Sequence, residues 1–207
     1  MASCHWSHPI VTMVARTSPR VPGRANLGKD GAVTSSDPLF ALLDEAREGN
    51  DASLAALVRE TQPAVWRLCA ALGAPEDPAD LTQETFVRVL RAMHGFRGDA
   101  PVQAWILSIA RRVCADSIRK RQRQRRLLNR IASVMSEEPT STIDRSLDDL
   151  VARLVPERRE VFVLTQQMGL SYEEAAAVIG CPVGTVRSRL ARARADLLTA
   201  VRSAETG

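Results

Sequence analysis

The stretch 184–194, GTVRSRLARAR, combines four arginines with small residues and contains no acidic side chain. An arginine can donate two hydrogen bonds to the O6 and N7 atoms of guanine or clamp a phosphate, and small neighbours let a helix backbone approach DNA closely. Helix surfaces that meet only water usually mix charges of both signs. The stretch therefore predicts a helix face that contacts a polyanion, with an ordinary solvated basic face as the alternative.

The residues before this stretch predict a helix, a tight turn and a second helix. Ser171 and Glu174 have the spacing of a capping box, so the first helix should begin near Tyr172. Gly180 should end it, because glycine accepts the left-handed conformation of a sharp turn. Pro182 should start the next helix. This is the helix-turn-helix pattern, whose second helix enters the major groove.

A helical wheel divides the second helix into two faces. The residues expected to pack on the preceding helices are Val186, Leu190, Ala193 and Leu197. The residues expected to point outward are Gly184, Ser188, Ala191, Arg192 and Ala195, with Arg187 and Arg189 on the flanks. Behind the motif, the segment LVPERREVFVLTQQMG predicts a packing helix with Leu154, Val161, Phe162 and Leu164 in the core. This register favours DNA contact over simple solvation.

A second group of charged and aromatic residues lies in the first half of the chain, where DPADLTQETFVRVLRAMHGF predicts one helix and VQAWILSIARRVCADSIRKRQRQRR a longer one. The first helix should bury Phe86, Val89, Leu90 and Met93, with Asp80, Glu84, Arg88 and Arg91 on its opposite face. The second should bury Val102, Ile106, Ile109 and Val113, with Ser108, Arg111, Ala115 and Arg119 on the other side. Both helices thus present charged faces to a partner or to water.

Composition favours helices and makes several functional classes improbable. Of 207 residues, 45% are hydrophobic and 4% aromatic, and 28 are basic against 24 acidic. The scattered cysteines show no disulfide framework or zinc spacing, which is typical of reduced cytoplasmic thiols, and the Cys4, His5 and His8 cluster is attributed to chance. No apolar run approaches the ~20 residues that span a bilayer. No phosphate-binding loop or other cofactor motif is visible.

We therefore predict an all-α chain with two small helical domains, an N-terminal helical bundle and a C-terminal helix-turn-helix domain, joined by a flexible linker. The expected boundaries are a disordered extension at 1–36, a first domain at 37–127, a linker at 128–145 and a second domain at 146–203.

With both motifs in view, the sequence resembles the extracytoplasmic-function (ECF) sigma factors of bacterial RNA polymerase, in the sigma-70 family. The resemblance covers about 36–203. DLTQETFVRVLRA and FRGDAPVQAWILSIARRVCADSIRKR are similar to the second conserved region of the family, and LVPERREVFVLTQQMGLSYEEAAAVIGCPVGTVRSRLARAR is similar to the fourth. The resemblance implies a factor that binds core polymerase, directs it to specific promoters and promotes melting of the −10 element.

The resemblance also implies three sets of site residues. The first helix would dock on the polymerase β′ clamp helices through Asp80, Leu81, Gln83, Glu84, Arg88 and Arg91, with Leu81 off the core stripe as an apolar anchor. The loop and long helix would bind single-stranded −10 DNA through Phe96, Arg97, Trp105, Arg111, Arg112 and Arg119. The family often carries asparagine at the position of Arg112, and Trp105 is more typical of a core residue than of a base platform. The −35 duplex would be contacted by Thr185, Arg187, Ser188, Arg189 and Arg192.

The partners implied are core RNA polymerase, through its β′ clamp helices and β flap, promoter DNA and an anti-sigma protein. We expect a cytoplasmic protein with no cofactor and no metal. The alternative is a stand-alone dimeric helix-turn-helix regulator, which would leave the DLTQETF helix unexplained. An enzyme is not expected, because His94 is the one histidine outside the first ten residues and no paired nucleophile and base are visible.

Overall fold

The computed structural model describes residues 37–73, 77–131 and 147–205, and all regular structure in these ranges is helical. The helices in chain order are α2 (Pro38–Arg47), α3 (Asp51–Gly73), α4 (Pro78–Ala92), α5 (Val102–Ile131), α6 (Leu147–Arg153), α7 (Pro156–Phe162), α8 (Tyr172–Ile179) and α9 (Val183–Glu205). A 3₁₀ turn at Met93–Gly95 follows α4, and a π-helical turn at Val163–Gln167 follows α7. The all-α prediction is confirmed. The predicted extension and most of the predicted linker lie outside the described residues, and α5 continues to Ile131, beyond the expected end of the first domain.

Side-chain caps fix several helix ends, as the local sequence predicts. The Asp37 carboxylate accepts the Leu39 N–H at 3.0 Å and, with its other oxygen, the Val102 N–H at 3.0 Å, so it joins the starts of α2 and α5. Ser171 and Glu174 form the predicted capping box at α8, with bonds of 3.1 and 2.7 Å. Gly180 follows α8 with φ 76°, the left-handed conformation that the turn requires.

Helix α3 is capped by the residue before it and contains a proline. The Asn50 side chain accepts the N–H groups of Ala52 and Ser53 at 3.1 and 3.2 Å. Pro63 lies inside the continuous α3. Its position is exposed, so water can satisfy the carbonyl that the missing proline N–H leaves free.

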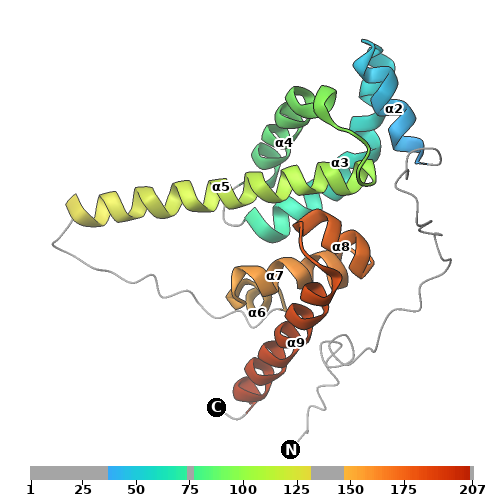
Figure 1. Ribbon diagram of the computed structural model, residues 1–207. Helices are drawn as coiled ribbons and strands as arrows, with labels where there is room; N and C mark the ends of the chain where they lie inside the picture. Colours follow the sequence, from blue (N-terminus) through green and yellow to red (C-terminus); the bar gives the residue numbers. More distant parts are fainter. Residues whose placement is uncertain (1–36, 74–76, 132–146, 206–207) are drawn as a thin grey trace, which may run out of the picture.

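In Figure 1 the long helix α5 runs across the molecule, with α2 and α4 above it and α6 to α9 below it, while α3 crosses it. It packs against α3 and α4, and it also packs against α8 from the second half of the chain. The buried apolar residues accordingly form one continuous core. Helix α5 buries Ala104, Leu107, Ala110 and Cys114 in addition to the predicted stripe.

A close approach around Gly73 fixes the packing of α3 on α4 and α5. A Cβ at Gly73 would overlap the Leu81 Cδ1 atom and lie 3.7 Å from the Cys114 Sγ atom. The Cys69 thiol, one turn earlier on the same face of α3, makes a hydrogen bond with Cys114 that raises the Cys114 pKa, and burial raises it further. Both thiols are free and buried, so they pack as small apolar groups.

We predict that Gly73→Ala lowers the free energy of unfolding by about 1–3 kcal/mol, because the added methyl group overpacks this contact. Urea denaturation measures the change. Gly95→Ala is the matched control, since a Cβ there meets nothing within 4 Å, and its effect should stay within about 0.5 kcal/mol. Equal losses in the two variants would contradict the close-approach explanation.

Candidate nucleic-acid and protein interfaces

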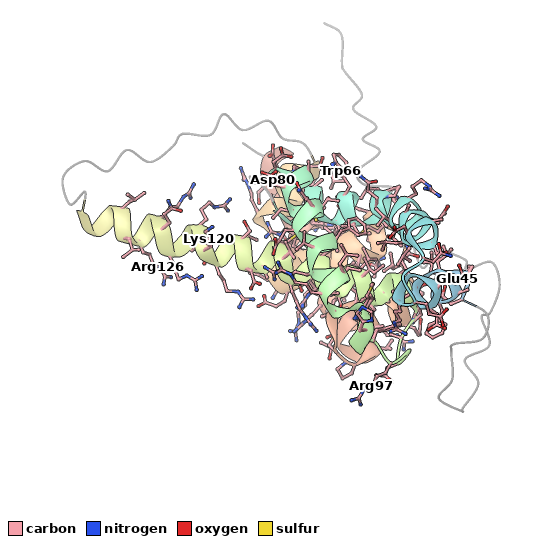
Figure 2. All side chains as sticks on the ribbon, turned by 90° about the horizontal axis from the view of Figure 1, so that it is seen from above. Glu45, Trp66, Asp80, Arg97, Lys120 and Arg126 are labelled. Carbon is pink, nitrogen blue, oxygen red and sulfur yellow. The ribbon has the colours of Figure 1, made fainter. Side chains whose placement is uncertain are left out.

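Helix α4 presents a polar outer face to water. Asp77 caps the helix by accepting the Ala79 N–H at 2.8 Å, and Pro78 occupies its first position. Asp80, Gln83 and Glu84 are exposed, as predicted, and Figure 2 shows Asp80 at the surface. Arg91 is also exposed on this helix. A partner can therefore approach these four polar side chains directly.

The apolar residue of this face differs from the predicted one. Leu81 was expected off the core stripe, which is wrong, because it is 6% exposed and fills the space that Gly73 leaves. Leu90 was expected in the core but is 40% exposed. It lies seven residues after Gln83, two helical turns along the same side. Leu90 is therefore the large apolar side chain that α4 offers to a partner.

Arg88 connects α4 to α5. Its guanidinium lies 2.8 Å from a Glu84 oxygen one turn earlier and 2.8 Å from a carboxylate oxygen of Asp116 on α5. The hydrogen bonds that Arg88 donates to Asp116 and, to a smaller extent, to Glu84 raise the pKa of Arg88. Of the residues predicted to dock on a protein partner, Arg88 is thus already held by two carboxylates.

The segment before α5 takes part in an aromatic cluster. The ring of Phe96 lies 4.7 Å from the Trp105 ring, centroid to centroid, and 6.5 Å from that of Phe40. Arg47 lies 5.9 Å from the Phe96 ring centroid and donates hydrogen bonds to the carbonyl oxygens of Met93, at 2.8 Å, and of Phe96. Phe96 and Trp105 therefore pack on each other in this structure, while Arg97 projects away from the body (Figure 2).

The predicted phosphate-binding arginines of α5 are in different environments. Arg112 and Arg119 are exposed. Arg111 is not free, because its Nε atom lies 3.0 Å from a carboxylate oxygen of Glu160 on α7. Beyond them the helix extends past the body and carries Lys120 and Arg126 into solvent (Figure 2). The basic surface of α5 is therefore largely accessible, but its Arg111 position is occupied.

The four arginines of 184–194 separate into two pairs. Arg187 and Arg192 are exposed, and Arg187 lies 6.0 Å from the Tyr172 ring centroid. Arg194 instead donates to the Gln166 side chain at 3.1 Å, and Arg189 is half-buried beside a cavity. The outward and core residues of α9 are as predicted: those at 184, 188, 191, 192 and 195 are exposed, and those at 186, 190, 193 and 197 are buried.

Further contacts keep α9 in place. Arg158 of α7 forms an ion pair with Asp196, so this arginine is engaged within the fold. Arg194 of α9 donates to the Gln166 side chain at 3.1 Å. The outward face of α9 is consequently presented by a helix anchored at both the apolar core and the polar edge.

A cavity of about 570 Å³ is lined by residues of α5, α7 and α9. Sequence reasoning did not find it, because it exists only where the two halves of the chain meet. Its charged lining residues are Arg111, Arg119, Arg121, Arg159, Arg189, Glu157 and Glu160. The excess of arginine makes this cavity electropositive.

Within the described ranges, no group of three or more His, Cys, Asp or Glu side chains is placed to hold a metal ion. The Cys4, His5 and His8 cluster lies outside these ranges. None of the helices in the described part of the chain is long and apolar enough to cross a membrane.

Comparison with protein families matches both halves of the chain. Residues 57–124 match the model of sigma-70 region 2, and residues 144–197 match the model of sigma-70 region 4. The first match covers most of α3, all of α4 and most of α5, and the second covers α6 to most of α9.

Relatives of known name support these matches. The chain is 42% identical over 185 residues to the ECF RNA polymerase sigma factor SigC of Mycobacterium tuberculosis, covering 84% of this chain and 94% of that protein. It is 30% identical over 173 residues to the ECF RNA polymerase sigma-E factor of Escherichia coli K12, covering 74% and 88%.

Solved structures are similar as well. CnrH, in complex with the cytosolic domain of CnrY, matches with a TM-score of 0.61 at 33% identity and covers 79% of this chain and 96% of its own. The sigma factor RpoE of Bartonella quintana, in complex with the anti-sigma factor NepR, matches with a TM-score of 0.59 at 26% identity, covering 72% and 96%.

The contacts of Arg47 yield a stability prediction. Arg47→Ala should lower the free energy of unfolding by about 1–3 kcal/mol, because two carbonyl groups lose a charged donor. Arg59→Ala, at an exposed position on α3, is the control and should change it by less than about 0.5 kcal/mol. Chemical denaturation of both variants distinguishes the cases, and an unaffected Arg47→Ala protein would contradict the anchoring role.

Proposed function

The chain belongs to the ECF sigma factors of the sigma-70 family, and from this premise we propose how its three surfaces divide the work of initiation. As an RNA polymerase sigma factor it is a transcription initiation factor that acts at promoters. We assign α4 to core polymerase, α5 and its preceding loop to the −10 element, and α9 to the −35 element.

The observation that carries the assignment is the outer face of α9. Arg187, Ser188 and Arg192 are exposed on a helix whose other side is fully packed. Gly184 and Ala191 lie on the same face and have little or no side chain, so they do not obstruct a partner. Such a face fits the major groove, where arginine reads guanine through two hydrogen bonds. In the proposal Arg187, Ser188 and Arg192 meet base edges.

The other two predicted residues of α9 are assigned to the backbone of the −35 duplex. Thr185 is half-buried at the start of the helix, and Arg189 is half-buried at its flank. Side chains in such positions reach phosphates more readily than base edges, and phosphate contacts set the register of a helix in the groove.

For the −10 element, the exposed groups on and before α5 supply the phosphate contacts. Arg97, Arg112 and Arg119 are exposed, and arginines of this kind track the backbone of a single strand. The rings of Phe96 and Trp105 stack on each other at 4.7 Å, so a base that uses either ring must enter beside this pair or displace one ring. Trapped bases hold the melted strand open without nucleotide hydrolysis.

For core polymerase, the exposed carboxylates of α4 and Leu90 form the docking face in the proposal, in place of the buried Leu81. Leu90 supplies apolar area on the same side of the helix as Gln83, while Asp80 and Glu84 supply charge. Interfaces of this kind combine a small apolar centre with a polar rim. The β′ clamp helices are the expected partner of α4, and the β flap is the expected partner of the region 4 half.

Docking also explains how two small DNA contacts become effective. Each contact by itself is weak, and attachment to one large partner raises the local concentration of the second after the first has formed. The proposal places this activity in the cytoplasm, where polymerase and promoters meet. An anti-sigma protein is a further expected partner. The similar RpoE was solved with the anti-sigma factor NepR bound, and the similar CnrH was solved with the cytosolic domain of CnrY bound.

We predict that Arg192→Ala weakens use of −35 elements selectively, by roughly 1–3 kcal/mol in discrimination between matched and mismatched sequences. Transcription from promoter variants with holoenzyme measures this. Arg153→Ala, an exposed position on α6, controls for the loss of one positive charge. An equal decrease on all promoters and on random DNA would assign Arg192 to phosphate instead.

We also predict that Asp80→Arg and Leu90→Asp each weaken binding to core polymerase about tenfold, through charge reversal and loss of apolar contact respectively. Co-purification and titration with labelled protein provide the measurement. Glu48→Arg, at the exposed end of α2, is the charge-reversal control. If both α4 variants bind core polymerase as the unmodified chain does, α4 is not the docking face.

A further inference from the structure

Arg187 of α9 differs from several other arginines of the fold in what restrains its side chain. Arg111, Arg158 and Arg194 each donate an N–H to a side-chain oxygen of another helix or turn. The guanidinium of Arg187 instead lies over the Tyr172 ring, with its carbon 6.0 Å from the ring centroid. Within the described ranges, Arg187 has no hydrogen-bond acceptor and no carboxylate partner. Its N–H donors are therefore all available to DNA.

A contact with the face of a ring suits an arginine that must read a base. Such a contact uses the flat side of the guanidinium, whereas the N–H groups lie along its edge. A carboxylate would also restrain the side chain, but it would occupy the donors that guanine O6 and N7 require. The Tyr172 ring therefore restrains Arg187 without using its hydrogen-bonding capacity.

The fold in turn restrains the Tyr172 ring. Tyr172 is the first residue of α8, and the two reciprocal hydrogen bonds between Ser171 and Glu174 fix that first turn. The Tyr172 side chain is half-buried and packs against the apolar core. Helix α8 also packs on α9, which carries Arg187. The ring is thus held at its backbone and at its buried side, so it can serve as a fixed platform for a residue of the next helix.

Arg192, the other arginine assigned to base edges, provides a comparison on the same helix. It is exposed, and no ring, carboxylate or amide of the described residues contacts its guanidinium. A long side chain without a partner loses rotamer freedom when it binds, and this loss weakens binding. Arg187 has already lost part of that freedom in the free protein. The two arginines therefore approach the groove with different degrees of preorganisation.

We propose that Tyr172 is a positioning residue for −35 recognition, which restrains the Arg187 guanidinium through its flat face and keeps the N–H edge free for a base. The inference rests on the proposed function, in which Arg187 meets a base edge, and it places part of the specificity outside the recognition helix. Tyr172 acts through Arg187 and needs no contact of its own with DNA. Loss of the ring should therefore matter only at the base pair that Arg187 reads.

The first test measures the motion of arginine side chains in the full chain without DNA. Nitrogen relaxation of the Nε–H groups, assigned with Arg187→Lys and Arg192→Lys, should give Arg187 the higher order parameter. Tyr172→Leu should lower the order parameter of Arg187 to that of Arg192, and Tyr172→Phe, which keeps the ring, should leave it unchanged. Equal mobility of the two arginines in the unmodified chain would overturn the inference.

The second test uses holoenzyme and promoters in which each −35 base pair is changed in turn. Arg187→Ala identifies the position that Arg187 reads, as the one where discrimination between bases falls. Tyr172→Leu should lower discrimination at that position about two- to fivefold, the factor expected for an exposed cation–π contact. Tyr172→Phe should retain it. In the Arg187→Ala background, Tyr172→Leu should have no further effect there, because the two residues act as one unit.

Ile179→Ala is the control for a loss of packing in α8. Ile179 is half-buried on this helix and packs against the same core as Tyr172. Its truncation should change transcription evenly across the −35 positions. If the profile of Tyr172→Leu is as even as that of Ile179→Ala, the role of Tyr172 is structural alone and the inference is wrong.

Tyr172→Phe also separates positioning from a direct contact of the hydroxyl with DNA. A phosphate contact carries no sequence information, so its loss would weaken all promoter sequences equally. Such a uniform decrease in Tyr172→Phe would assign the hydroxyl to phosphate and overturn the positioning role.

The same transcription data separate the inference from the proposed function. If Arg187→Ala changes discrimination at no −35 position, the base-reading role proposed for Arg187 is refuted. If Arg187→Ala changes discrimination at one position and Tyr172→Leu does not, the base-reading role stands and the positioning role of Tyr172 is refuted.

Discussion

Burial of α5 on two sides is the constraint on which the rest of the structure depends. One side carries the apolar stripe that α3 and α4 cover, and another meets α8 from the second half of the chain. A single helix is thus the core of the first domain, the carrier of the predicted −10 arginines and the docking surface for the second domain. Any change in the placement of α8 alters which α5 side chains can meet DNA, because both use the same helix.

Small residues allow close approach at two places, around Gly73 of α3 and on the outer face of α9. Gly73 lets Leu81 and Cys114 pack against α3, which seats α4 on the bundle. Gly184 and Ala191 leave the outer face of α9 without bulk. The first approach is internal and sets stability, whereas the second is external and suits a duplex. In both places the absence of side-chain volume determines what can come near.

The parts of the fold that sequence reasoning predicted are those decided by neighbouring residues. The capping box of Ser171 and Glu174, the Gly180 turn and the register of α9 depend on contacts within a few residues, and all are confirmed. Positions decided by packing were predicted less well. Leu81 and Leu90 exchanged their expected places, because a wheel gives the direction of a side chain but not which neighbouring helix covers it.

Long-range polar contacts were beyond the sequence for a similar reason. Arg88, Arg111 and Arg194 each find partners 28 to 49 residues away, and the sequence shows an arginine without showing its acceptor. For the three interfaces, the sequence predicted residue types and helices, while the structure added which arginines are already engaged. Arg112 and Arg192 are accessible to DNA, whereas Arg111 and Arg194 already bind side chains within the fold.

Run-off transcription measures the central claim most directly. Core polymerase is incubated with genomic fragments, with and without this chain, and transcript starts are mapped. The account predicts new starts, each preceded by a shared pair of elements at the −10 and −35 positions, that appear only when the chain is present. An unchanged set of starts, with the chain bound to polymerase or not, would contradict it.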